Sequence, residues 1–194
     1  MIFGVSTTRS AVVIAETKGA GDKFVISAIR LIPFQVQSGD DLAGLLQTLG
    51  TIFERGRKRA GFVVALLKCS SGRFGSCLEA IKAEAITELA AFQKGVHLVK
   101  VAPQSLKKTL GCASDQKWRD RAADLFNSDG RHRNWSKGSA GAASVAYKVA
   151  GGQLVSEVAS GRSNPSLTAV GGAPGLRTLV FSPLPLREKR SPRS

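Results

Sequence analysis

The acidic residues whose spacing could serve metal chemistry fall in one stretch of the chain. Glu79, Glu84 and Glu88 recur at helical spacing, and the last two stand one turn apart. Carboxylates are the ligands that Mg²⁺ takes in metal-assisted phosphodiester chemistry. Acidic residues repeated along a helix more often form a solvated face, with Glu79 and Lys82 as a helical pair. We therefore expect a charged surface here and keep a metal site at Glu84 and Glu88 as the alternative.

Basic residues dominate the chain as a whole. Lys and Arg number 28 against 14 Asp and Glu, which gives a formal net charge of +14. Such an excess favours an acidic partner, with nucleic acid first and an anionic membrane surface second. The alternative is that the charge mainly prevents self-association, because net charge bears on partners and solubility and not on fold.

Several cations are interleaved with tryptophans in the second half of the chain. Trp118 and Trp135 stand among them and could stack on bases, although packing helices on a sheet is the more usual role of such residues. The candidate nucleic-acid-binding residues are Lys68, Arg73, Lys107, Lys108, Lys117, Arg119, Arg131, Arg133 and Lys137.

Neither the cysteines nor the histidines form the pattern of a catalytic or metal site. The three cysteines are an odd number and too widely spaced for a disulfide framework or a zinc site. His97 lies in an alternating apolar run typical of a strand, and neither it nor His132 has a Ser or Cys partner that would suggest a nucleophilic triad. We therefore expect no cofactor and no metal, and reduced thiols.

Hydrophobic periodicity predicts one α/β domain. Apolar and β-branched runs predict strands at residues 2–6, 11–15, 24–29, 62–67 and 96–101. Apolar residues at helical spacing predict helices at residues 42–53, 76–93, 103–110, 115–126 and 139–150. Ser38 is suited to cap the first of these helices. The buried face of the second helix is predicted to consist of Leu78, Ile81, Ala85, Leu89 and Phe92.

The periodic pattern ends near residue 152. Gly, Pro, Ser and Arg dominate residues 153–194, which predicts a basic tail without regular structure after a folded domain at residues 1–152. The chain does not open with a signal-peptide pattern and has no run of 18 apolar residues. We therefore expect a cytoplasmic protein that does not cross a membrane.

The predicted order of elements, βββαβαβαα(α), is that of the RNase H-like superfamily. The segment Gly4–Glu16 (GVSTTRSAVVIAE) resembles the first hairpin of Holliday-junction resolvases of the RuvC type. The segment Val99–Gly111 (VKVAPQSLKKTLG), followed by Lys117, resembles their strand-Pro-x-x-x-Lys-x-x-x-Gly passage. The resemblance covers about residues 2–150 and implies an RNase H-like mixed sheet, in which three antiparallel strands are followed by parallel strands with helical crossovers.

A closer resemblance is to an uncharacterised bacterial family of short proteins. Its members carry a similar strand that ends in Lys, a short basic loop and a helix with a Lys-x-Glu-Ala motif. The corresponding residues here are Leu67-Lys68, Gly72-Arg73-Phe74 and Lys82-Ala83-Glu84-Ala85.

The RNase H-like resemblance also implies where a nuclease site would lie. Such nucleases hold divalent metals with carboxylates from the first strand, the end of the fourth strand and the last helix. The first two positions are Ser6 and Lys68 here, and the predicted last helix at 139–150 contains no Asp or Glu. An ammonium at Lys68 would repel a divalent cation.

The sequence therefore predicts a non-catalytic nucleic-acid-binding protein on a RuvC-like scaffold, with Lys68 as its foremost contact. Two alternatives stay open, namely a metal-dependent nuclease with relocated acidic ligands and a protein–protein adaptor that has kept the fold. Neither the kind of nucleic acid nor the oligomeric state follows from the sequence.

Overall fold

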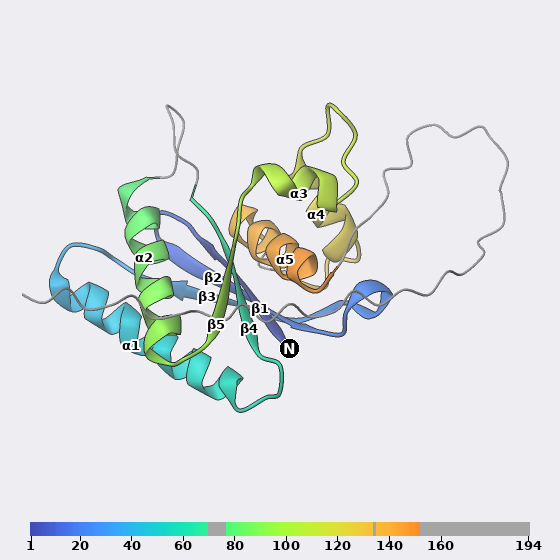
Figure 1. Ribbon diagram of the computed structural model, residues 1–194. Helices are drawn as coiled ribbons and strands as arrows, with labels where there is room; N and C mark the ends of the chain where they lie inside the picture. The colour runs from blue at the N-terminus through green and yellow to red at the C-terminus, as the bar shows by residue number, and fades with distance from the viewer. Residues whose placement is uncertain (70–76, 134, 152–194) are drawn as a thin grey trace, which may run out of the picture. The chain divides into compact units, whose positions relative to one another are not determined.

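The computed structural model describes residues 1–69, 77–133 and 135–151 (Figure 1). The predicted tail at 153–194 and the loop that carries Arg73 lie outside these residues. Within the described part of the chain, no helix is long and apolar enough to cross a membrane.

The described strands form one mixed sheet with β1 at its centre. β1 (Ile2–Thr7), β2 (Ala11–Lys18) and β3 (Val25–Pro33) are antiparallel neighbours. β4 (Val63–Leu67) pairs in parallel with β1, and β5 (His97–Val101) pairs in parallel with β4. The order across the sheet is β3-β2-β1-β4-β5. The predicted mixed sheet is confirmed, and His97 is a strand residue as expected.

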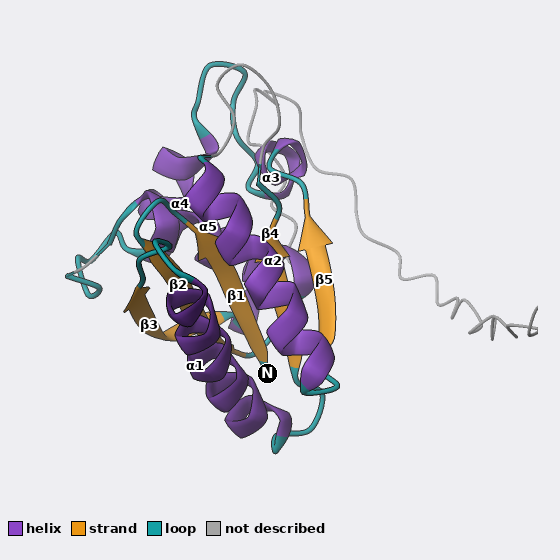
Figure 2. Cartoon of the chain, turned by 90° about the vertical axis from the view of Figure 1, so that its left-hand side faces the viewer, coloured by secondary structure: helices purple, strands orange, loops and turns teal. Residues whose placement is uncertain are grey.

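Helices cover both faces of this sheet (Figures 1 and 2). α1 (Gly39–Arg57) and α2 (Leu78–Gln93) pack on one face and supply the two parallel crossovers. α5 (Lys137–Val149) packs on the other face, beside α3 (Gln104–Thr109) and α4 (Trp118–Phe126). A short 3₁₀ turn precedes β3.

The first helix begins where the sequence predicts. The Asp41 backbone N–H donates to Ser38 Oγ at 3.2 Å, and the Ser38 N–H donates to the Asp41 carboxylate at 2.9 Å. This reciprocal capping box satisfies two donors at the start of α1. It also lowers the pKa of Asp41, because backbone N–H groups of Gln37 and Ser38 bind its charged form.

The packing of α5 on β1 leaves no space for a side chain at Gly4 or at Gly141. A Cβ added at Gly4 would lie 1.9 Å from the carbonyl oxygen of Ala142, and one added at Gly141 would lie 2.7 Å from Ser6 Oγ. All residues from Gly138 to Tyr147 are buried. The run of small residues in α5 is therefore what lets this helix lie directly on the central strand.

The predicted buried face of α2 is wrong. Leu78, Ile81 and Leu89 are 62%, 46% and 41% exposed, and Phe92 is 82% exposed. Ala85 is also exposed. The face turned inward consists of Ala80, Ala83, Glu84, Thr87, Ala90 and Ala91. The helix packs against the sheet and α1 through small residues, which allow close approach, and its large apolar residues are left outside as an exposed stripe.

Replacing Gly4 by alanine should lower the free energy of unfolding by about 3 kcal/mol, the upper part of the usual range for overpacking. The new methyl group would meet backbone atoms of Ala142, which cannot move without displacing α5. Urea unfolding followed by circular dichroism measures the effect. Gly44→Ala is the control, because Gly44 in α1 has open space around it and alanine favours the helix. A Gly4→Ala variant as stable as the wild type would contradict the observed packing.

Candidate nucleic-acid interface

A small cleft opens where β1 and β4 end, between the β1–β2 turn and the first residues of α4 and α5. Its volume is about 110 Å³. It is lined by Ser6, Thr7, Thr8, Leu67, Lys68, Cys69, Pro103, Arg119, Lys137 and Gly138. In open α/β sheets, the carboxyl ends of the strands are the usual place for a ligand.

Three predicted cations meet at this cleft, namely Lys68, Arg119 and Lys137, which we call the cleft cations. All three are exposed. Lys68 is held next to β5, because its backbone N–H donates to the Val101 carbonyl at 2.9 Å. The guanidinium carbon of Arg119 lies 4.7 Å from the centre of the Trp118 ring, a cation–π contact that orients its side chain.

The backbone adds to the positive potential of the cleft. α4 begins at Trp118 and α5 at Lys137, so the N-terminal ends of two helices lie beside the cleft cations. Ser136 caps α5 by accepting from the Ser139 N–H at 3.2 Å. A helix N-terminus carries a partial positive charge and favours anions. The arrangement is suited to holding a negatively charged group such as a phosphate.

The cleft does not fit the divalent metals of RNase H-like nucleases. Its charged groups are ammonium and guanidinium, which repel metal cations. Ser6 is only 4% exposed, and a carboxylate on α5 opposite it would have no room, since Gly141 already packs against the Ser6 hydroxyl. Among the residues that the structure describes, no group of three or more His, Cys, Asp and Glu side chains is placed to hold a metal ion.

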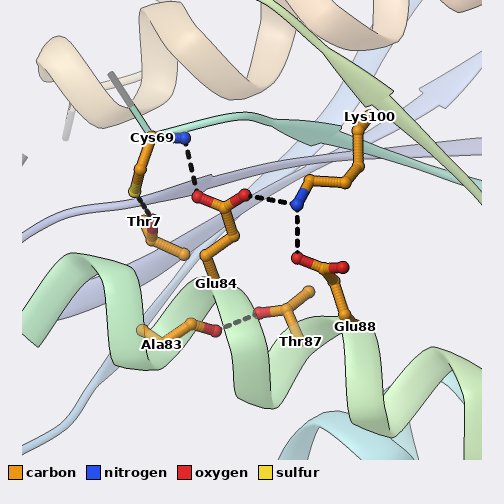
Figure 3. A network of polar contacts seen from close by, with 7 residues as sticks. All are labelled: Thr7, Cys69, Ala83, Glu84, Thr87, Glu88 and Lys100. Carbon is orange, nitrogen blue, oxygen red and sulfur yellow. Dashed lines mark hydrogen bonds and ion pairs between the residues drawn. The ribbon is translucent and has the colours of Figure 1, made fainter. Parts of the chain in front are cut away.

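One buried carboxylate lies next to the cleft and is bound by two donors (Figure 3). Glu84 accepts a hydrogen bond from the Cys69 N–H at 2.6 Å and forms an ion pair with Lys100 at 2.8 Å. Lys100 also reaches Glu88 at 2.6 Å. The predicted solvated face is therefore wrong at Glu84, which is only 6% exposed. The physical reason is that the Cys69 N–H lies beyond the end of β4 and needs an acceptor, which α2 supplies.

The pKa values of this network follow from its contacts. Burial alone would raise the pKa of Glu84, but the hydrogen bonds from Lys100 and Cys69 outweigh burial and hold the pKa below its usual value. Hydrogen bonds to Glu84 and Glu88 raise the pKa of Lys100. Both shifts favour the charged forms, so the pair stays ionised at neutral pH.

This network gives no support to a relocated metal site. The Lys100 ammonium contacts both carboxylates and takes the place that a cation would need between them. A divalent ion would have to displace Lys100 and also leave the Cys69 N–H without its acceptor, which is costly for a partly buried donor.

Three further predicted cations lie on the elements that border the cleft. Lys107 and Lys108 are in the last turn of α3, and Lys117 precedes α4. All three are exposed. Lys107 Nζ donates to the Ser114 carbonyl at 3.4 Å, which ties it to the loop between α3 and α4.

The remaining predicted cations do not share the cleft. Arg131 forms an ion pair with Asp129 at 2.8 Å and lines a separate pocket beside Val25, at the opposite end of the sheet. Arg133 is exposed in the same loop as Arg131. Arg73 falls outside the described residues, so its predicted place near Lys68 stays a prediction.

Both tryptophans are half-buried packing residues. Trp118 and Trp135 pack against the cluster of α4 and α5 residues that includes Leu110. The ring of His132 stacks on Trp135, with 6.3 Å between ring centres, and Arg119 lies over Trp118. Packing is therefore favoured over base stacking as their role.

The sequence patterns missed the polar residues beside the cleft cations. Thr7 and Thr8 line the cleft, and Thr7 Oγ1 lies 3.4 Å from Cys69 Sγ. The signal that could have found them is adjacency in the chain, because Thr7 follows Ser6 and Cys69 follows Lys68. No local signal distinguishes Glu84 from an exposed helical glutamate, because its burial depends on the neighbouring strands.

Solved structures of Holliday junction resolvases share this architecture. Thermus thermophilus RuvC aligns with a TM-score of 0.60 at 16% identity, over 75% of this chain and 90% of that one. T. thermophilus RuvC in complex with a Holliday junction substrate gives 0.58 at 13% identity, over 78% and 97%. The yeast mitochondrial Holliday junction resolvase gives 0.52 at 10%, over 77% and 76%. The fold is RuvC-like.

No family model matches the sequence, and no curated protein is significantly similar to it. The RuvC-like fold therefore rests on the three-dimensional alignment. The resemblance to the uncharacterised bacterial family rests on short motifs alone. At these identities the likeness establishes the fold and not the activity.

Replacing Glu84 by alanine should lower the free energy of unfolding by about 2–3 kcal/mol, because the Cys69 N–H loses this acceptor and Lys100 keeps only Glu88. Glu88→Ala is the matched control and should cost less than about 1 kcal/mol, since the Glu88 side chain is 39% exposed and Lys100 keeps Glu84. Urea unfolding at neutral pH compares the two variants. Equal effects would contradict the assignment of Glu84 as the anchor of the network.

The stabilisation by Glu84 should be lost in acid. The pKa of Glu84 is lowered in the folded state, so its contribution is complete above the unfolded-state pKa of about 4.3 and declines as the pH falls through the folded-state pKa. The difference in unfolding free energy between the wild type and Glu84→Gln should be constant from about pH 6 to pH 8 and should shrink below about pH 4. A difference that stays constant into acid would show that the carboxylate charge is not what stabilises the contact.

Proposed function

We propose that this protein binds nucleic acid at the cleft cations and does not cut it. The observation that carries the proposal is the convergence of Lys68, Arg119 and Lys137 on one cleft at the carboxyl ends of β1 and β4. Lys and Arg neutralise backbone phosphates, and the planar guanidinium of Arg binds phosphate oxygens in pairs. The net charge of +14 adds long-range attraction.

The residues of the cleft support binding without cleavage. No His, Asp or Glu is among the described residues that line it, so these residues offer neither the imidazole nor the carboxylate that most often activates a water. The positions at which the RNase H-like resemblance expects carboxylates carry a serine, a lysine and a helix that contains no Asp or Glu. A phosphate would be held here by cations directly.

A branched DNA is the first ligand to test. One of the solved structures with the same fold is a complex with a Holliday junction substrate. The structural likeness alone does not show that this protein binds the same ligand. The binding test therefore compares a four-way junction with duplex and single-stranded DNA of matched length.

Changing each cleft cation to alanine should weaken binding to all of these DNAs. If each cation contacts one phosphate, the slope of log affinity against log salt should fall in magnitude by about 0.9 for each residue removed. Fluorescence anisotropy over a series of salt concentrations measures both quantities. Arg131→Ala removes the same charge at the other end of the sheet, from an ion pair with Asp129, and is the matched control.

Two results would contradict the proposal. One is an affinity that does not depend on salt or is absent at low salt. The other is a loss of affinity for Arg131→Ala as large as that for Lys68→Ala, because the cleft would then have no special role.

Purified protein incubated with Mg²⁺ or Mn²⁺ should leave junction, duplex and single-stranded DNA intact. Denaturing gel electrophoresis of end-labelled strands provides the measurement. Cleavage that is lost in Glu84→Gln would favour the relocated nuclease instead. The same assay on Glu88→Gln shows whether cleavage requires one of the two carboxylates or both.

A protein-binding role is the second candidate, favoured by the exposed stripe of α2. Leu78, Leu89 and Phe92 lie on its outer face, where apolar side chains of this size mark interaction surfaces. After nuclease treatment, light scattering should then show an assembly larger than one chain, and Phe92→Ser should reduce it to the monomer. A monomer mass before and after the change would exclude self-association through α2.

A further inference from the structure

A second basic pocket lies at the opposite end of β1 from the cleft. Its volume is about 130 Å³, and its charged lining consists of Arg55 and Arg59 at the end of α1, Arg30 of β3 and Glu16 of β2. We call it the arginine pocket. Figures 1 and 2 both show the end of α1 beside the start of β1. Phe3 in its floor belongs to the core under α1, so the pocket and the cleft are separate sites.

Two positive charges of the arginine pocket have no carboxylate within ion-pair distance among the residues that the structure describes. Arg30 is paired with Glu16. Arg55 and Arg59 take part in none of the ion pairs among the described residues. Arg59 instead donates to the neutral sulfur of Met1 at 2.9 Å, a weak acceptor that leaves the charge uncompensated.

The helix end by itself does not account for this arrangement. The dipole of α1 stabilises the cations in its last turn, Arg55 and Arg57, but Arg59 lies beyond the end of the helix. Arg55 and Arg59 nevertheless line the same pocket, where like charges repel. An anion bound between the two guanidinium groups would attract both of them and offset their mutual repulsion.

We propose that the arginine pocket binds a doubly charged phosphate group. A phosphate monoester carries about −1.5 to −2 at neutral pH, which matches the two uncompensated arginines. Guanidinium forks suit phosphate oxygens, and Arg55 and Arg59 are both in the lining of this pocket. The volume is similar to that of a cavity of about 150 Å³ that holds a benzene molecule, so a phosphate group fits.

Inorganic phosphate and the phosphorylated end of a nucleic-acid strand share this chemistry. Calorimetric titrations with inorganic phosphate, with a 5′-phosphorylated oligonucleotide and with its 5′-hydroxyl form distinguish these sources. We expect saturable binding of one phosphate per chain that Arg55→Ala combined with Arg59→Ala weakens at least tenfold. Both side chains are exposed, and circular dichroism checks that the variant folds.

Lys58→Ala combined with Lys23→Ala is the charge-matched control and should bind phosphate as the wild type does, because both residues are exposed and neither lines the pocket. Lys68→Ala combined with Lys137→Ala should also leave this binding unchanged, so the result does not depend on the proposed function of the cleft. Unchanged affinity in the double arginine variant, loss only in the Lys68 and Lys137 variant, or no saturable binding of any probe would overturn the proposal.

Discussion

Helix α5 lies directly on β1 because a glycine stands at each point of closest approach between the two elements. Gly4 leaves space for the backbone at Ala142, and Gly141 leaves space for the hydroxyl of Ser6. β1 is the central strand, so this contact sets the position of one helical layer against the whole sheet. The same contact removes the volume in which carboxylates on a last helix would face a metal ion. Close packing thus leaves no room for a carboxylate on α5 opposite Ser6.

The one buried acid near this end of the sheet serves the fold. Glu84 joins α2 to the end of β4 through the Cys69 N–H and to β5 through Lys100. Because Cys69 follows Lys68, this bond fixes the backbone from which the foremost cleft cation extends. The contacts of this carboxylate with an ammonium and a backbone donor hold β4, β5 and α2 together.

The cations of this strongly basic chain are grouped in separate places. The cleft cations lie beside α4 and α5 at one end of β1, and the arginine pocket lies under the end of α1 at the other. α2 is different, since it contains three Glu and one Lys and exposes an apolar stripe. The cleft cations, the arginine pocket and the exposed stripe of α2 therefore consist of different residues. Mutations can test the role proposed for each of them separately.

The sequence by itself determined the five strands and their order along the chain, because strand runs are local patterns. It also showed that acids are absent from the three positions at which the RNase H-like resemblance expects them, since the residue type at a position is a local property. It also placed the cap at Ser38. Only the tertiary structure decided which face of α2 is buried, that Glu84 is enclosed, and which of the predicted cations meet. Those outcomes depend on distances between segments far apart in the chain. Alanines pack α2 more closely than its leucines would, and Lys68, Arg119 and Lys137 become neighbours only when the sheet and helices assemble.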